Sequence, residues 1–194
     1  MEIIVWANSL NKKTILTTNF GPYESVILHM VSKVNKKMDI VWIDSGYNTR
    51  STYLFAEKVI KKFSLNIHIF NPLMSAKRRD SIMKGIPDVT SPLHRVFTEQ
   101  VKLEPFERVL SSMHPEIWLT AIRKEQTAHR KEMGVVSKVN DNLIKVAPVF
   151  NYTESQMKEY ISKNNLPDEH DYYDPTKVIK NRECGLHIEN FKKK

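Results

Sequence analysis

The sequence has a single cysteine in 194 residues and no long apolar run. One thiol cannot form an internal disulfide, so the cysteine count does not indicate export. The N-terminal apolar run, Ile3–Ala7, is too short for the apolar core of a signal peptide, and no stretch is long enough to span a bilayer. Tandem repeats are also absent, and low complexity is confined to Lys192–Lys194. We therefore expect a cytoplasmic protein.

Positive charge exceeds negative charge by a clear margin. Thirty Lys and Arg residues against 22 Asp and Glu give a net charge of +8 and a pI near 9.4. Such a field attracts nucleic acid, phosphorylated small molecules or a membrane surface, although a lysine-rich solvated surface has the same composition. With 41% hydrophobic and 27% charged residues, the chain otherwise has the composition of one soluble domain with a sizeable core.

Strand-like and helix-like segments alternate through the first half of the chain. Strands are expected at Thr14–Thr18, Asp39–Ile43 and Asn66–Phe70, and helices at Tyr23–Lys36 and Thr52–Phe63. This alternation with short connections is typical of a parallel α/β sheet, and right-handed crossovers make it doubly wound, with helices on both faces. Met1–Ser9 is ambiguous: its β-branched residues suggest a strand, and a short helix is the alternative.

The second half continues the same pattern less regularly. The segment Ser75–Met113 is predicted to be helical, with breaks at Pro87, Pro92 and Pro105. Two further strands are expected at Glu116–Ile122 and Leu143–Pro148, and a last helix at Thr153–Ile161, with Thr153 as its cap. No sustained periodicity follows Asn164. We therefore expect a nucleotide-binding domain over residues 1–164 and an irregular tail over 165–194.

Two loops follow predicted strands at the end where parallel sheets bind ligands. The first, T-T-N-F-G-P-Y-E-S (Thr17–Ser25), enters a helix, so its hydroxyls, Gly21 and free backbone N–H groups could hold an anion. The second, D-S-G-Y (Asp44–Tyr47), offers a carboxylate and hydroxyls to a ribose or base. Both segments are also compatible with ordinary strand-to-helix turns.

Basic residues cluster just after a later strand. The segment W-L-T-A-I-R-K-E-Q-T-A-H-R brings Arg123 and Arg130 to the strand's end, and arginine forks match phosphate or sulfate oxygens. A solvated basic helix start explains the same pattern. Lys102, in V-K-L-E-P, is less specific by itself.

The single thiol, Cys184, lies in N-R-E-C-G-L-H, outside the predicted core. A structural thiol would sit in an apolar run, and Cys184 with His187 makes at most half a metal site, so we expect no metal. As a nucleophile the thiol makes physical sense, because Lys180 and Arg182 would lower its pKa and favour the thiolate, against the opposing charge of Glu183. The pattern favours a reactive thiol.

Together these motifs resemble the phosphoadenylyl-sulfate (PAPS) reductase family along nearly the whole chain. E-C-G-L-H (Glu183–His187) resembles the family's C-terminal catalytic signature. Four more motifs recur in the family's order: T-T-N-F-G resembles S-S-F-G, D-S-G-Y resembles D-T-G-Y, K-L-E-P resembles K-V-E-P, and I-R-K-E-Q-T-A-H-R resembles L-R-R-E-Q-S-x-x-R. The resemblance implies an adenine nucleotide alpha hydrolase-like fold.

The resemblance also implies a mechanism. Cys184 would attack the sulfur of PAPS and expel adenosine 3′,5′-bisphosphate, and thioredoxin or glutaredoxin would then release sulfite from the S-sulfonated enzyme in sulfate assimilation. His187 would assist the thiolate. Substrate binding would fall to Thr17, Thr18, Asn19, Phe20 and Gly21 for the nucleotide, Asp44, Ser45 and Gly46 for ribose and adenine, and Lys102, Arg123, Arg130 and Arg182 for sulfate and phosphate.

Relatives that reduce adenylyl sulfate (APS) usually carry paired cysteines for an iron–sulfur cluster. This chain has one cysteine, which excludes a [4Fe–4S] cluster by ligand count and implies PAPS as substrate. We expect no bound cofactor and a thioredoxin or glutaredoxin partner. A homodimer and a cluster-free APS reductase both stay open.

Two other classes of protein compete with this interpretation. An ATP pyrophosphatase of the same fold would adenylate a substrate or transfer sulfur, but its S-G-G-x-D-S motif is replaced here by N-F-G-P-Y-E-S, without the twin glycines and the aspartate. A nucleic-acid-binding module would fit the net charge, yet no recognition helix or aromatic-interleaved basic strand is present. A relative that binds the nucleotide without turnover is a third alternative.

Overall fold

The early strands have the predicted bounds. In the computed structural model, which describes residues 1–177, they are β1 (Thr14–Thr18), β2 (Asp39–Ile43) and β3 (Asn66–Phe70). The later parallel strands, β4 (Ile117–Leu119) and β6 (Ile144–Val146), are shorter than predicted. A strand that was not predicted, β5 (Val136–Lys138), pairs antiparallel with β6.

The sheet has the strand order β3-β2-β1-β4-β6-β5 and is parallel except at the β5 edge. In register, Leu16 of β1 lies opposite Ile40 on one side and Leu119 on the other. The chain therefore builds outward from β1 through β2 and β3, and later returns to the other side of β1 with β4. A crevice for ligands is expected at this reversal, outside the carboxyl ends of β1 and β4.

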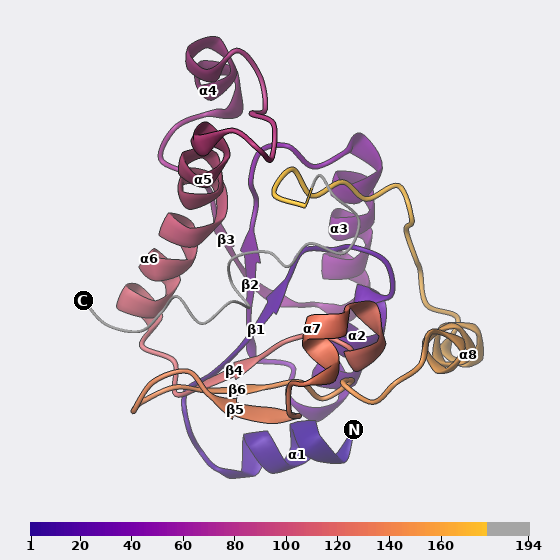
Figure 1. Ribbon diagram of the computed structural model, residues 1–194. Helices are drawn as coiled ribbons and strands as arrows, with labels where there is room; N and C mark the ends of the chain where they lie inside the picture. Colours follow the sequence, from indigo (N-terminus) through magenta and orange to yellow (C-terminus); the bar gives the residue numbers. More distant parts are fainter. Residues whose placement is uncertain (178–194) are drawn as a thin grey trace.

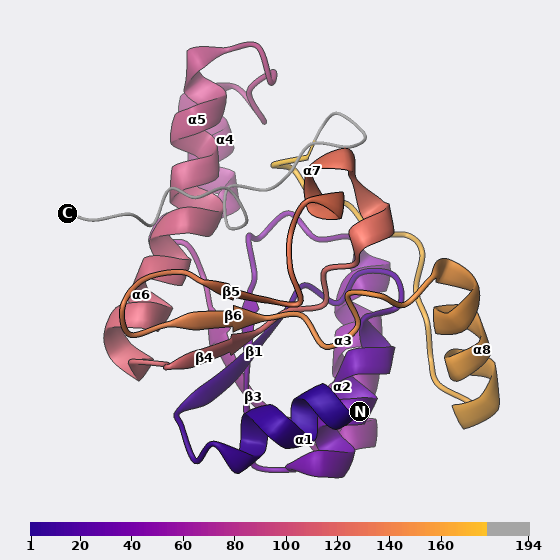
Figure 2. The ribbon, with the colours of Figure 1, turned by 60° about the horizontal axis from the view of Figure 1, so that its bottom comes forward.

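Helices cover both faces of the sheet, as the sequence predicted (Figure 1). One face carries α1 (Glu2–Ser9), α2 (Glu24–Val34), α3 (Arg50–Phe63) and α8 (Glu154–Asn164). Figure 2 shows α8 outside α2, on which it packs. The other face carries α6 (Glu104–Met113), and α4 (Ala76–Met83), α5 (Pro92–Thr98) and α7 (Ala128–Lys131) complete the described helices. None of the helices within residues 1–177 is long and apolar enough to cross a membrane.

The alternation of side chains along each strand divides the core into two layers. On β1, Leu16 faces the cluster shared with α2 and α3, whereas Ile15 faces α6. Beneath α6, Phe106 and Trp118 are fully buried, with ring centroids 4.6 Å apart. Burial on both faces explains the continuous apolar runs Ile40–Ile43 in β2 and Ile117–Leu119 in β4.

The N-terminal segment and the region around Pro105 are both helical. Met1–Ser9, left ambiguous by the sequence, contains the helix α1, which buries Ile4 and Ala7 against the first layer. The predicted break at Pro105 is wrong, because helical structure runs unbroken from Pro92 to Met113 through a π-helical turn at Glu99–Leu103. Pro105 lies in the first turn of α6, where a missing N–H is tolerated.

Candidate active site

A pocket lies at the carboxyl ends of the central strands, at the reversal of strand order. Thr17 and Thr18 at the end of β1, Ile43 at the end of β2 and Thr120 just after β4 contribute to its walls. About 120 Å³ is open to water-sized molecules. The remaining lining residues are Asn19, Glu24, Ser45, Asn48, Val101, Lys102, Ala121, Ile122, Gln126, Arg130, Tyr172, Tyr173, Asp174, Pro175, Thr176 and Lys177.

The loop from β1 to α2 is held by its own polar side chains. The Thr18 hydroxyl accepts a hydrogen bond from the Phe20 N–H at 3.2 Å, and Asn19 Oδ1 accepts one from the Gly21 N–H at 2.9 Å. A Cβ on Gly21 would lie 3.0 Å from Asn19 Oδ1 and 3.3 Å from the Tyr172 ring, so glycine permits this close approach. Of the five loop residues predicted to bind a nucleotide, Thr17, Thr18 and Asn19 line the pocket.

Phe20 differs from its loop neighbours. Its side chain is fully buried in the core, against the rings of Trp42 at 4.9 Å and Phe55 at 6.4 Å. Phe20 adopts a positive φ of 51°, which turns the chain between β1 and α2. The side chain therefore anchors the loop to the core and does not line the pocket.

The D-S-G-Y loop divides into a structural residue and a pocket residue. The Asp44 carboxylate accepts hydrogen bonds from the Gly46 N–H, Asn48 and Tyr53. Gly46 has a positive φ of 80°, which suits glycine. Ser45 lines the pocket, whereas Asp44 and Gly46 are not among its lining residues. Asp44 thus organises the loop that presents Ser45.

Lys102 stands on the π-helical turn and reaches a buried carboxylate. Its ammonium lies 2.6 Å from Asp174 Oδ2, with side-chain exposures of 14% and 5%. Burial would raise the pKa of Asp174, but the Lys102 charge, its hydrogen bond, the Thr176 hydrogen bond and the Lys177 charge outweigh burial. The pKa of Asp174 is therefore far below its ordinary value, and the carboxylate is ionised.

The two arginines predicted after β4 have different surroundings. Arg130 on α7 is 4% exposed and lines the pocket, where its guanidinium contacts Gln126. Arg123 is 5% exposed, contacts Glu125 and lies over the Tyr23 ring at 5.4 Å, outside the set of lining residues. The backbone between them is fixed by a capping box, in which the Arg123 N–H donates to Gln126.

The carboxyl group of Glu24 also lines the pocket, and the sequence analysis did not identify Glu24 as a site residue. It lies in the first turn of α2 and accepts a hydrogen bond from the Thr18 hydroxyl at 3.0 Å. Burial raises the pKa of Glu24 to about 7, against the lowering effects of Thr18, Lys177 and Arg130. The group is therefore poised to exchange a proton near neutral pH.

Thr120 is a second pocket residue that the sequence did not single out. Its side chain is 1% exposed, and its hydroxyl has no hydrogen-bond partner within residues 1–177. A buried hydroxyl without a partner costs free energy, and this one lines the pocket. Thr120 is therefore a candidate for a hydrogen bond to a ligand.

Residues 168–177, which we term the strap, form the remaining wall. Asp168 Oδ1 accepts from the Tyr23 N–H at 2.9 Å, and the Asp171 carbonyl accepts from the Thr49 hydroxyl at 2.6 Å. The strap therefore joins the starts of α2 and α3 to Lys102. Figure 1 shows it in yellow beside the upper end of α3. Cys184, His187 and Arg182 follow the strap and lie outside the described residues. Residues 1–177 hold no cluster of three potential metal-ligating side chains.

The fold is of the adenine nucleotide alpha hydrolase-like class. NAD synthetase from Campylobacter jejuni has a similar structure, with a TM-score of 0.57 at 8% identity over 85% of this chain and 69% of that one. FMN adenylyltransferase from Candida glabrata gives 0.56 at 14% identity over 80% and 49%. At such low identity these likenesses show the fold alone.

Sequence comparison then narrows the class to a family. The profile of the phosphoadenosine phosphosulfate reductase domain matches residues 13–174, so the chain belongs to that family. It is 30% identical over 177 residues to the phosphoadenosine 5′-phosphosulfate reductase of Synechocystis sp., covering 89% of this chain and 70% of that one. The crystal structure of PAPS reductase from Candida auris, a phosphate complex, has a TM-score of 0.73 at 28% identity, over 86% and 80% of the chains. Membership places the chain among the sulfonucleotide reductases and confirms the resemblance inferred from the motifs.

Proposed function

We propose that the protein reduces PAPS to sulfite and adenosine 3′,5′-bisphosphate, with thioredoxin or glutaredoxin as the electron donor. The observation that carries this proposal is the pocket at the β1/β4 reversal, where Lys102 and Arg130 meet the β1–α2 loop within the stretch that matches the family. Buried cations beside a loop at a helix start are suited to the phosphate and sulfate groups of such a nucleotide.

The first half-reaction transfers the sulfonate group to the protein. The Cys184 thiolate attacks the sulfur, and the bond between sulfur and the bridging phosphate oxygen breaks. Its electron pair leaves with adenosine 3′,5′-bisphosphate, and Cys184 becomes S-sulfocysteine. Lys102 and Arg130 would stabilise the negative charge that moves to the leaving group.

The second half-reaction reduces the intermediate. One thiolate of the reductant attacks the Cys184 sulfur and expels sulfite, which leaves a mixed disulfide. The second thiol of the reductant resolves that disulfide and returns Cys184 to the thiolate. The dithiol supplies the two electrons, so no bound redox cofactor is needed. His187 would assist the Cys184 thiolate.

The other residues predicted to bind substrate would contribute in different ways, according to their positions in the structure. Thr17, Thr18 and Asn19 would hold the nucleotide with their side chains, and Phe20 and Gly21 with the backbone. Ser45 would face ribose or adenine, with Asp44 and Gly46 shaping its loop. Arg123 and Arg182 would add positive charge, and Lys177, which lines the pocket, is a further cation for a phosphate group.

Intact-protein mass spectrometry tests this proposal directly. Reduced protein is mixed with PAPS, and separately with APS, without any reductant, and Cys184→Ser serves as the matched control. We expect a sulfonate-sized mass gain with PAPS that thioredoxin removes with release of sulfite, and no gain in the control. A gain with APS instead would identify a cluster-free APS reductase. Absence of an adduct with either nucleotide would reject the reductase proposal.

A further inference from the structure

The strap carries a carboxylate to one of the cations proposed to bind substrate. Asp174 Oδ2 forms an ion pair with the Lys102 ammonium. The proposed function puts a sulfate or phosphate oxygen of the substrate at this position. The two residues are 72 positions apart in sequence, so the contact depends on how the strap crosses the pocket. A free carboxylate and a sulfate oxygen are both anionic hydrogen-bond acceptors, and they compete for the same ammonium protons.

The Asp174 side of this contact is built into the fold. Oδ1 of Asp174 accepts hydrogen bonds from the Thr176 N–H at 3.0 Å and the Thr176 hydroxyl at 2.7 Å. The side chain is 5% exposed, so the carboxylate has little access to water. A buried charge that loses its partner is strongly destabilised. Loss of Lys102 to a ligand would leave this buried carboxylate with only the Thr176 hydrogen bonds and the more distant Lys177 charge, so its present position would become less favourable.

The small open volume of the pocket also indicates that the strap would have to move to admit a nucleotide. Its open volume of about 120 Å³ is small beside the roughly 300–1,000 Å³ of typical small-molecule sites. The walls formed by β1, β2 and the π-helical turn are regular structure packed on the core, whereas the strap is irregular. The strap is thus the wall whose movement would make room for a nucleotide.

We propose that Asp174 is an internal competitor for Lys102, and that a ligand's anionic group displaces it and thereby releases the strap. This inference rests on the proposed function for the identity of the ligand. The pair would make release selective: a ligand with an anion at Lys102 opens the strap, and an uncharged nucleoside does not.

Ligand affinity measures the competition. Calorimetry with PAPS in the Cys184→Ser background, which blocks turnover, compares Asp174→Asn with Asp171→Asn. Asp171 is an exposed strap residue, so its variant makes the same change in charge away from Lys102. We expect Asp174→Asn to raise PAPS affinity five- to tenfold and Asp171→Asn to change it less than twofold. Adding Lys102→Met should abolish the gain. Unchanged or weaker binding by Asp174→Asn would overturn the proposal, because Asp174 would then be a positioning residue for Lys102.

A ligand-free measurement separates this inference from the proposed function. Hydrogen exchange over residues 168–173 follows the strap without any nucleotide. We expect at least tenfold faster exchange in Asp174→Asn than in Asp171→Asn, because the first variant lacks the ion pair that holds the strap. Equal exchange in the two variants would overturn the proposal. Failure of the protein to bind any sulfonucleotide would reject the proposed function and leave this exchange result to decide the role of Asp174.

Discussion

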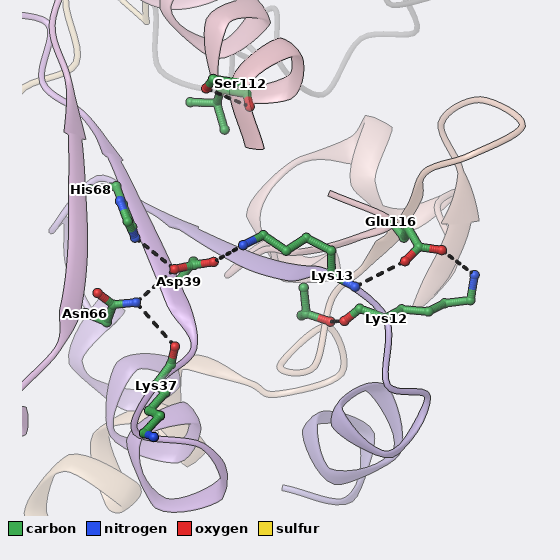
Figure 3. A network of polar contacts seen from close by, with 10 residues as sticks. Lys12, Lys13, Lys37, Asp39, Asn66, His68, Ser112 and Glu116 are labelled. Carbon is green, nitrogen blue, oxygen red and sulfur yellow. Dashed lines mark hydrogen bonds and ion pairs between the residues drawn. The ribbon is translucent and has the colours of Figure 1, made fainter. Parts of the chain in front are cut away.

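The two ends of the parallel sheet both carry charged networks, but these differ in burial. At the amino-terminal edge, Asp39 accepts from Lys13 at 2.7 Å and lies 2.8 Å from His68 Nε2 (Figure 3). Asp39 is 17% exposed, but its partners Lys13 and His68 are 48% and 39% exposed. At the carboxyl-terminal edge, Lys102 and Asp174 are 14% and 5% exposed.

This difference distinguishes a structural network from a candidate ligand site. Exposed pairs are solvated and screened by salt, so the Asp39 network tunes stability modestly while joining the starts of neighbouring strands. Buried charges are costly to desolvate, and a protein gains little stability from them over apolar packing. Charges concentrated in a pocket at the strand ends are therefore better explained by a ligand than by stability.

The largest effect should come from a cation of the pocket. We expect Arg130→Met to weaken PAPS binding by about 1.5–3 kcal/mol, as for a lost charge-assisted hydrogen bond. Arg123 lies against Tyr23 and Glu125, so Arg123→Ala tests whether the same loss extends beyond the lining residues. Calorimetry measures both, and Lys13→Met at the opposite edge should leave affinity unchanged. Equal affinities for Arg130→Met and the unaltered protein would remove Arg130 from the site.

Glu24→Gln tests the cost of a carboxyl group in the pocket. Burial raises the pKa of Glu24 to about 7, above its ordinary value of 4.5, so the folded protein holds a proton that the unfolded chain releases. The stability from this group is complete below pH 4.5 and is lost as the pH rises through 7. We expect the variant to be more stable than the unaltered protein by about 1–3 kcal/mol at pH 8, with a much smaller difference at pH 5. Urea unfolding at the two pH values checks this, and a gain independent of pH would contradict it.

Thr120→Val tests the buried hydroxyl near the end of β4. The substitution keeps the side-chain shape and removes the hydroxyl, so we expect nucleotide binding to weaken by about 1 kcal/mol. Thr120→Ser keeps the hydroxyl and should retain most of the affinity. The free energy of unfolding should not fall in Thr120→Val, since the hydroxyl has no partner within residues 1–177. A loss of stability with unchanged affinity would make Thr120 a structural residue.

The smallest effect is expected at Asp39, near the amino-terminal ends of the strands. Burial would raise the pKa of Asp39, but hydrogen bonds and charge from Lys13 and His68 lower it overall. The stability from this group is present above its ordinary pKa of 3.8 and is lost as the pH falls through the lower folded value. We expect Asp39→Asn to cost about 0.5–1 kcal/mol at pH 7 and less in high salt. Thermal unfolding without denaturant, at low and high salt, measures this loss of stability. An altered PAPS affinity of Asp39→Asn would contradict the contrast between the two ends of the sheet.

Local sequence signals predicted the elements whose burial follows a simple pattern. The strands β1, β2 and β3 were placed to the residue because β-branched runs are bounded there by turns and polar residues. The cap at Thr153 was also confirmed, with the Gln156 side chain completing the box. In contrast, β5 is three residues long and mostly exposed, so it has no apolar signature to recognise.

The site was predictable where a motif carries it and not where distant residues meet. Thr17, Thr18, Asn19, Ser45, Lys102 and Arg130 were identified from motifs and line one pocket. The positions of Glu24, Thr120 and Asp174 in the pocket wall were not predicted, because each depends on contacts that the motif spacing does not reveal. Phe20 shows the reverse case, since its motif position hides a side chain that belongs to the core.

The sequence by itself determined the alternating α/β order and the family motifs, because these depend on local periodicity and on residue types at short spacing. The reactive character of Cys184 stays a prediction from the sequence. The tertiary structure alone decided that α6 continues from α5 through a π-helical turn, that Glu24 shares the pocket with Arg130, and that Asp174 meets Lys102. Those outcomes depend on burial and on contacts between segments far apart in the chain. Desolvation and Coulomb energies change with such contacts, and the order of residues along the chain does not encode them locally.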